Sequence, residues 1–289
     1  MKNPWRGVLR IAILLVTIAI FAGYTYEHPE LLDRLGRMSP DVVVTLLLLY
    51  IVWFAALALT VQMTLGLCHA QVRASELGLL TAYSTLMNFF VPGQSGLIVR
   101  GVYMKKQHGL AVKRYLLASL IYYACYAVIS AFMLLVASRP WWQTVGGLAL
   151  AGLGSFVVVR WYERRSEAGT MGLDLGLRSL GLLLFATAVQ ACVQVAVYGF
   201  ELHVVEPGIR FSQALTFTGA ANFSLFVALT PGAIGIRESF LYFSRELHHV
   251  GTATIVAASV LDRTVFMLLL ALLFVVSIVF HAKRALKIN

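Results

Sequence analysis

The chain has 289 residues, of which 60% are hydrophobic and only 12% charged, whereas soluble domains are about 45–50% apolar and about 25% charged. This composition excludes an ordinary soluble domain and indicates an integral membrane protein, with room for roughly seven or eight spans of about 20 residues and none for a soluble catalytic domain. The formal net charge of +10 does not indicate nucleic-acid binding, because the basic residues are spread over several short loops. The cysteines lack C-x-x-C spacing and predict neither a disulfide framework nor a metal site: Cys68, Cys125 and Cys192.

Apolar runs predict six membrane-spanning helices, in chain order at 8–26, 42–66, 115–137, 141–159, 175–203 and 252–281. Two further apolar stretches, 76–107 and 211–247, are interrupted by proline and glycine, the first by Pro92, Gly93 and Gly96, the second by Pro231, Gly232 and Gly235. Each interruption leaves two pieces of about 15 residues, which rise only ~22 Å as helices against ~30 Å of hydrocarbon. We therefore expect two re-entrant helical hairpins, each of which enters and leaves on one side of the membrane.

The distribution of lysine and arginine predicts the orientation. With six spans, two hairpins and a cytoplasmic amino terminus, the segments inside hold 15 of the 23 Lys and Arg residues, the segments outside hold six, and Arg178 and Arg263 lie within helices. This bias favours a multi-pass protein with both termini in the cytoplasm, and we expect it in the inner cell membrane. The first span also has features of a signal peptide, but the internal repeat requires it as a span.

The chain contains an internal repeat with an offset of 139 residues, which divides a single transmembrane domain (1–289) into halves of about 1–138 and 139–289. Each half has the order span, span, broken hairpin, span, which favours duplication over chance identities. Three crossings per half give an inverted-topology repeat, so the two hairpin tips are expected to enter from opposite faces and meet near the midplane. The offset superposes Pro92 on Pro231, Gly93 on Gly232, Gly96 on Gly235 and Tyr103 on Tyr242.

The two P-G-x-x-G tips predict an anion site. Proline stops the first helix of each hairpin, and the glycines admit a tight turn. A second half-helix that starts at about Leu97 or Ile236 then directs free N–H groups and its positive dipole end into a cavity. A simple helix break is the alternative interpretation, but two copies at equivalent places, each followed by an arginine, favour the site.

Charged residues lie beside these tips and deep in the last span: Arg100, Arg237, Glu238, Asp262 and Arg263. Asp262 and Arg263 are successive on a helix and point about 100° apart, so they need partners from elsewhere. We expect Arg237 to pair with Asp262, or Glu238 with Arg263, in a network at the second tip. A purely structural salt-bridge cluster is the alternative, although Arg100 and the helix dipoles leave a positive surplus that an anionic ligand would neutralise.

Two polar stripes lie at helical spacing, one on the span after the first hairpin and one on the span before the second. Helix packing is the favoured interpretation, and lining of a pathway is the alternative. The first stripe comprises Ser119, Tyr122, Tyr126 and Ser130, and the second comprises Gln190, Gln194, Tyr198 and Glu201.

Three segments carry a family resemblance: NFFVPGQSGLIVR (88–100), TPGAIGIRESFL (230–241) and LDRTVF (261–266). Together they resemble the flippase-type transmembrane domain of lysylphosphatidylglycerol synthases and its stand-alone relatives, the YbhN-like proteins. The first motif departs from the family, which usually has Gly-Glu before the arginine where this chain has Gly96 and Leu97, and the following helix lacks the family's charged residues. The resemblance implies movement or binding of an anionic lipid or polyprenyl-phosphate carrier, and does not imply synthesis of lysyl lipid.

We therefore expect an all-α, flippase-like lipid translocase, not an enzyme, which binds an anionic phospholipid or polyprenyl-phosphate-linked lipid between the tips. The expected binding residues are the five charged residues, the six tip prolines and glycines, Tyr103 and Tyr242. The alternatives are a scaffold or accessory subunit of a lipid or cell-envelope polysaccharide pathway and an intramembrane transferase with Asp262 or Glu238 as general base. No cofactor or metal is expected, and a second copy of the chain or pathway enzymes are candidate protein partners.

Overall fold

The computed structural model describes residues 39–91, 94–136, 172–227 and 236–286, and the single positions Trp142, Gly146 and Gly154. The predicted span at 8–26 lies outside the described residues, as does 141–159 apart from those single positions. The same holds for five of the six tip residues: Pro92, Gly93, Pro231, Gly232 and Gly235. Every regular element in the described ranges is a helix, in agreement with the predicted all-α class.

Four long helices confirm four of the predicted spans: α3 (Pro40–Leu67), α6 (Val112–Leu135), α8 (Leu177–Val205) and α12 (Thr252–Leu286). The shortest of them has 24 residues and therefore rises about 36 Å, which exceeds the ~30 Å of a hydrocarbon core. All four are apolar enough to cross a membrane over most of their length. The chain is therefore a multi-pass membrane protein.

Shorter helices replace a continuous span in the two interrupted stretches. The first contains α4 (Ala74–Phe90) and α5 (Ser95–His108). The second contains α9 (Phe211–Ser224), a short 3-10 turn (Leu225–Val227), α10 (Ile236–Phe243) and α11 (Arg245–His248). The helices α4 and α5, of 17 and 14 residues, rise only about 26 and 21 Å, so neither crosses a hydrocarbon core alone. The first break, between Phe90 and Ser95, includes Pro92 and Gly93, whereas in the second stretch α9 already ends at Ser224, before Pro231.

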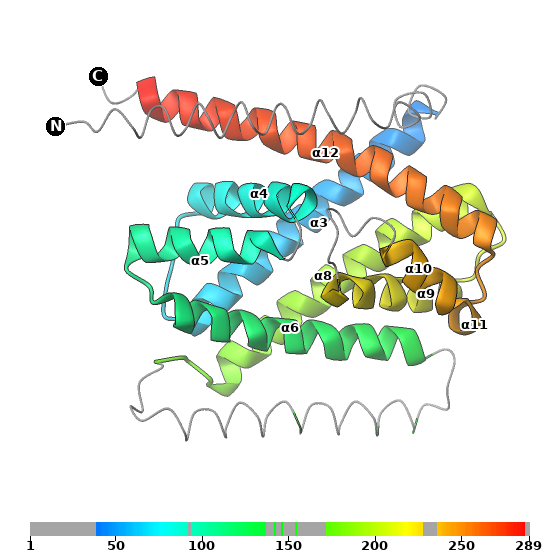
Figure 1. Ribbon diagram of the computed structural model, residues 1–289, viewed down its shortest axis with the longest axis horizontal. Helices are drawn as coiled ribbons and strands as arrows, with labels where there is room; N and C mark the ends of the chain where they lie inside the picture. The colour runs from blue at the N-terminus through cyan, green and yellow to red at the C-terminus, as the bar shows by residue number, and fades with distance from the viewer. Residues whose placement is uncertain are drawn as a thin grey trace.

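The two short-helix pairs lie between the long helices (Figure 1). In that view α12 runs along one edge and α6 lies toward the opposite edge, with α4 and α5 on the left and α9 and α10 on the right. The helices α3 and α8 pack against one another and cross the molecule diagonally between these edges. Within the described parts, the 139-residue offset carries α3 onto α8, α4 onto α9 and α6 onto α12, which matches the predicted order of elements.

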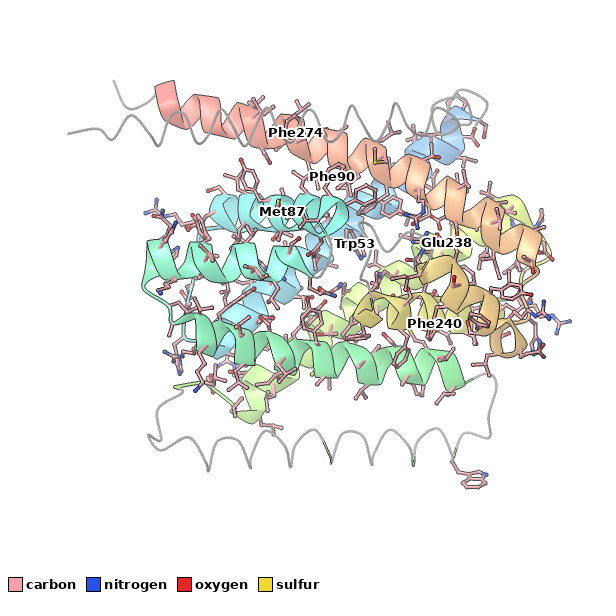
Figure 2. All side chains as sticks on the ribbon, in the orientation of Figure 1. Trp53, Met87, Phe90, Glu238, Phe240 and Phe274 are labelled. Carbon is pink, nitrogen blue, oxygen red and sulfur yellow. The ribbon has the colours of Figure 1, made fainter. Side chains whose placement is uncertain are left out.

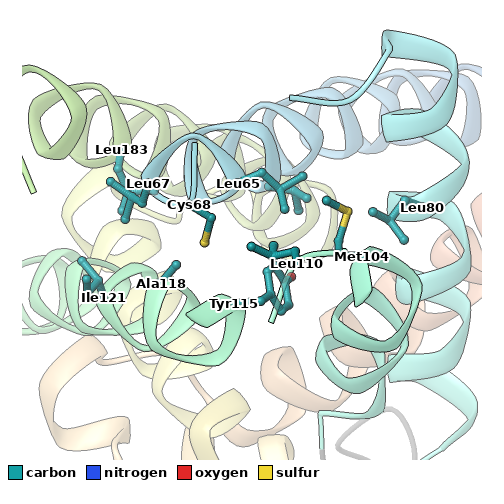
Figure 3. Close-up of a cluster of buried hydrophobic side chains, with 11 residues drawn as sticks. Leu65, Leu67, Cys68, Leu80, Met104, Leu110, Tyr115, Ala118, Ile121 and Leu183 are labelled. Atoms are coloured by element: carbon teal, nitrogen blue, oxygen red, sulfur yellow. The ribbon is translucent and has the colours of Figure 1, made fainter. Parts of the chain in front are cut away.

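Buried apolar clusters fix each short-helix pair to the long helices. Figure 3 shows the cluster of the first half, in which residues from α3, α4, α5, α6 and α8 meet, including Leu65, Leu80, Met104, Tyr115 and Leu183. A second cluster joins α8, α9, α10 and α12 through residues that include Leu202, Phe217, Leu241 and Ile255. These contacts hold the ends of the short helices in place, so the side chains near the breaks have defined positions.

The start of α5 lies in unusually close contact with α4 at Gly96. A Cβ atom added to Gly96 would lie 2.3 Å from the carbonyl oxygen of Ser84 and 2.7 Å from Oδ1 of Asn88. The Asn88 carboxamide accepts a hydrogen bond from the Gly96 N–H at 2.7 Å, and the Ser95 hydroxyl donates to the Met87 carbonyl at 2.7 Å. Glycine is therefore required here by close approach of two backbones, and it sets the position of the rest of α5.

Candidate functional site

A cavity of about 230 Å³ lies where the two short-helix pairs approach the long helices. Its wall takes residues from both halves of the chain and contains three of the predicted arginines. In Figure 2, the labelled Trp53, which lines this cavity, and Glu238 both lie toward the middle of the molecule. The polar and charged lining residues include Asn88, Gln94, Arg100, Tyr122, Tyr126, Gln190, Gln194, Arg237, Asp262 and Arg263.

Both predicted charge pairs form between α10 and α12. A terminal nitrogen of Arg237 lies 2.6 Å from Oδ2 of Asp262, and the Arg263 guanidinium contacts Oε1 of Glu238 through NH2 at 2.6 Å and Nε at 3.3 Å. Arg237 and Asp262 are each only 8% exposed. Removing a charge from water costs several kcal/mol unless an opposite charge lies close by. The sequence therefore predicted partners for Asp262 and Arg263 from another helix, and α10 provides both.

A tyrosine and a glutamate that the prediction did not include in the site extend this network to α3 and α8. The Tyr50 hydroxyl contacts Oδ1 of Asp262 and lies 2.9 Å from Oε1 of Glu201. Glu201 is 1% exposed and Tyr50 is 4% exposed. The guanidinium of Arg237 also lies over the ring of Tyr198, with its Cζ atom 5.9 Å from the ring centroid. The charged cluster therefore reaches four helices: α3, α8, α10 and α12.

Arg100 of α5 has a different environment, since its described partners are neutral. Its Nε donates to the Tyr115 hydroxyl at 2.7 Å and its NH1 donates to the Ser84 hydroxyl at 3.0 Å. The residue is 6% exposed and lines the cavity. In the described ranges, no carboxylate lies within salt-bridge distance of this guanidinium. Arg100 is thus a buried cation whose charge is not neutralised by a described side chain.

The two polar stripes join α6 to α8 and also line the cavity. The Tyr126 hydroxyl donates to Oε1 of Gln194 at 2.6 Å, and the Tyr122 hydroxyl donates to Oε1 of Gln190 at 3.4 Å. Helix packing, the favoured interpretation, is therefore confirmed for these pairs. All four residues are also lining residues of the cavity, so packing and lining are not exclusive here.

Gln94 links the break of the first short-helix pair to the second pair. Its Nε2 donates to the Leu225 carbonyl at 3.0 Å, and its Oε1 accepts from the Tyr123 hydroxyl at 2.7 Å. The residue has φ 59°, a left-handed conformation that costs a side chain other than glycine about 1–2 kcal/mol. The two side-chain hydrogen bonds hold Gln94 in this conformation and bring the break of α4 and α5 next to the end of α9.

Four of the predicted site residues in the described ranges do not line the cavity: Gly96, Tyr103, Glu238, whose carboxylate pairs with Arg263, and Tyr242. The Tyr103 hydroxyl donates to Oε1 of Glu76 at 2.7 Å, and Tyr242 is 44% exposed with the Arg245 guanidinium over its ring. Gly96 contacts α4 rather than the cavity. The described residues contain no group of three or more His, Cys, Asp or Glu side chains suited to a metal ion.

Comparison with known proteins assigns the chain to a family. No curated protein matches it. The family described as lysylphosphatidylglycerol synthase TM region matches residues 7–275, a range that contains both short-helix pairs and the whole lining of the cavity. The resemblance drawn from the three segments 88–100, 230–241 and 261–266 is thereby confirmed. The chain belongs to the lysylphosphatidylglycerol synthase transmembrane-region family.

Proposed function

We propose that this protein is a lipid translocase that binds a phosphate-bearing lipid headgroup in the cavity between its two short-helix pairs. The observation that carries the proposal is Arg100, a buried guanidinium at the cavity with only neutral described partners. The other two arginines of the wall already have carboxylate partners. Among the five predicted charged residues, three arginines face two carboxylates, which leaves one positive charge in excess that an anionic headgroup neutralises.

The chemistry of Arg100 suits phosphate. A guanidinium donates two parallel hydrogen bonds to two oxygens of one phosphate and keeps its charge at any physiological pH. Gln94, which precedes the first residue of α5, also lines the cavity, so the amino end of this helix contributes a positive partial charge to the same space. Tyr and Gln side chains that also line the cavity offer hydrogen-bonding groups to the rest of a headgroup.

The proposed topology has six spans and two re-entrant hairpins in two inverted halves. The protein lies in the inner membrane, and both of its termini are in the cytoplasm. The headgroup then crosses between the hairpins while the acyl chains remain in lipid. Single-cysteine reporters in 107–114 should react only from the cytoplasmic side, and reporters in 246–251 only from outside. Labelling of both loops from one side would refute the inverted arrangement.

The functional test compares lipid headgroups in proteoliposomes. We expect the protein to bind and move fluorescent phosphatidylglycerol or a polyprenyl phosphate in preference to phosphatidylcholine. Arg100→Lys, which keeps the charge but loses the planar fork, should weaken this preference, and Arg100→Gln should abolish it. Lys106→Gln is the matched control, because it removes one charge from an exposed position of the same helix. If the wild type bound and moved anionic and zwitterionic lipids equally well, the proposal would be excluded.

A second candidate function is a scaffold or accessory subunit of a lipid pathway. Four of the five predicted charged residues pair with one another between α10 and α12, and such pairs also serve to fix packing. In that case the Arg237 and Asp262 variants lose stability while the Arg100 variants behave as wild type. We favour the translocase because the scaffold gives no role to a cavity with an unneutralised arginine, and we propose no catalytic step.

A further inference from the structure

A continuous hydrogen-bonded chain runs from the interior of α8 to the cavity. Glu201 on α8 lies 2.9 Å from the Tyr50 hydroxyl on α3, Tyr50 contacts Asp262 on α12, and Asp262 lies 2.6 Å from the Arg237 guanidinium on α10. Asp262 and Arg237 line the cavity, as does Tyr50, whereas Glu201 lies behind them and is 1% exposed. These hydrogen bonds link the buried Glu201 to Arg237, whose side chain lines the cavity.

The number of hydrogen atoms on these side chains determines which of the two carboxyl groups is protonated. A tyrosine hydroxyl has one hydrogen and donates one hydrogen bond, but the Tyr50 oxygen contacts two carboxyl groups. One contact must therefore use a hydrogen of a carboxylic acid. Asp262 has a guanidinium partner at 2.6 Å and is the carboxylate. Within the described residues Glu201 has no cation at salt-bridge distance, and an isolated buried carboxylate is costly, so Glu201 is the acid.

The groups around Glu201 support this assignment. The ionisable residues that face it are Tyr50 from α3, Asp262 from α12, Arg237 from α10 and Tyr198 from its own helix. The described parts of α6 and α9, which also pack on α8, place no ionisable group within hydrogen-bonding distance of it. Asp262 is closer to Arg237 than Glu201 is, so the single nearby cation neutralises Asp262.

We infer that Glu201 is a proton-binding site and that its proton is coupled to anion binding in the cavity. This inference rests on the proposed function. An anion held by Arg100 that also bonds Arg237 in the wall of the same cavity competes with Asp262 for the Arg237 guanidinium. The Tyr50 hydroxyl then passes its proton to Asp262 while it receives the Glu201 proton. Glu201 becomes a carboxylate and takes up a proton from water, so one proton enters the site with each anion.

The expected signature is a pH dependence of affinity. When one proton is taken up with the ligand, the dissociation constant rises up to tenfold for each unit of pH, and the proton in turn binds more tightly when the anion is present. Glu201→Gln is a neutral isostere whose amide still donates to Tyr50. We expect its dissociation constant for fluorescent phosphatidylglycerol to change less than twofold over a range of pH in which that of the wild type changes tenfold or more.

The matched control is Glu206→Gln at the end of the same helix. Glu206 accepts a hydrogen bond from the Thr254 hydroxyl at 2.7 Å and does not line the cavity. This variant should keep the wild-type pH dependence. Should Glu201→Gln fail to fold, Tyr50→Phe keeps the ring contact with Phe266, whose centroid lies 5.3 Å away, and removes the relay hydroxyl. It should bind the anion with little dependence on pH.

Infrared spectroscopy of the protein without added lipid tests whether Glu201 is protonated. The wild-type protein at neutral pH should show the carbonyl band of a protonated carboxylic acid, and Glu201→Gln should lose that band. Absence of the band from the wild type, or its persistence in Glu201→Gln, would overturn the inference. So would a Glu201→Gln protein with the wild-type pH dependence. Equal binding of phosphatidylglycerol and phosphatidylcholine by the wild type would instead refute the proposed function, and the loss of the band would still support a protonated Glu201.

Discussion

Replacement of Gly96 by alanine tests whether close helix contact positions Arg100. The added Cβ atom would lie 2.3 Å from the Ser84 carbonyl oxygen, whereas carbon–oxygen contacts are normally about 3.3–3.6 Å. The start of α5 must therefore retreat by about 1 Å. Overpacking of this kind costs about 1–3 kcal/mol. The two Arg100 hydrogen bonds, at 2.7 and 3.0 Å, would lengthen toward the limit of hydrogen bonding, so the guanidinium would lose its fixed position.

Gly78→Ala in α4 is the matched control for this substitution. Nothing lies within 4 Å of a Cβ atom at Gly78, and alanine in a helix interior is favoured over glycine by about 1 kcal/mol. We expect Gly78→Ala to raise the unfolding temperature in detergent slightly, while Gly96→Ala lowers it and weakens binding of fluorescent phosphatidylglycerol. Equal stability and equal affinity of the two variants would show that α5 does not depend on this contact.

Two further predictions concern charge. Arg237→Gln and Asp262→Asn should each cost about 3–5 kcal/mol of unfolding free energy, because each leaves a buried charge without its closest opposite charge. The double variant should cost less than the sum by about 0.5–3 kcal/mol, and additive losses in denaturant titrations would rule out the pairing. Burial lowers the pKa of His248 below its ordinary value of 6.5, and its Nδ1 accepts the Val250 N–H at 3.1 Å. Because the unfolded chain binds this proton more readily, the stability that neutral His248 contributes should be lost as pH falls below about 6.5. His248→Gln should show a smaller loss of unfolding temperature over the same range, and an unchanged pH dependence would contradict the assignment.

Several features of this site follow from the sequence because each has a single strong physical cause. Proline and glycine stop helices, so the break after α4 was predictable in place although not in conformation, whereas α9 ends at Ser224, seven residues before Pro231. Charges within an apolar span need partners, which led from Asp262 and Arg263 to the pairs with Arg237 and Glu238. In both cases the local residues alone define the constraint.

Other features depend on contacts between distant helices and leave no local pattern. Tyr50 lies in a strongly apolar helix, where a tyrosine is compatible with packing, with lipid contact or with a polar network. Its role depends on Glu201 and Asp262, which are 151 and 212 residues away. Gln94 likewise adopts a conformation that glycine favours, and only its bonds to Tyr123 and Leu225 account for it.

The Gln94 contact determines which parts of the molecule separate most readily. Among the described residues, one neutral hydrogen bond, from Gln94 to the Leu225 carbonyl, joins the first short-helix pair directly to the second, and such a bond contributes about 0.5–1.5 kcal/mol. Two charge pairs, each with a contact of 2.6 Å, join α10 to α12, and charge-assisted hydrogen bonds are roughly twice as strong as neutral ones. Separation of the first short-helix pair from the second therefore needs less free energy than separation of α10 from α12. The second short-helix pair and α12 should move as one unit. Arg100, which lies on α5, should move with the first short-helix pair.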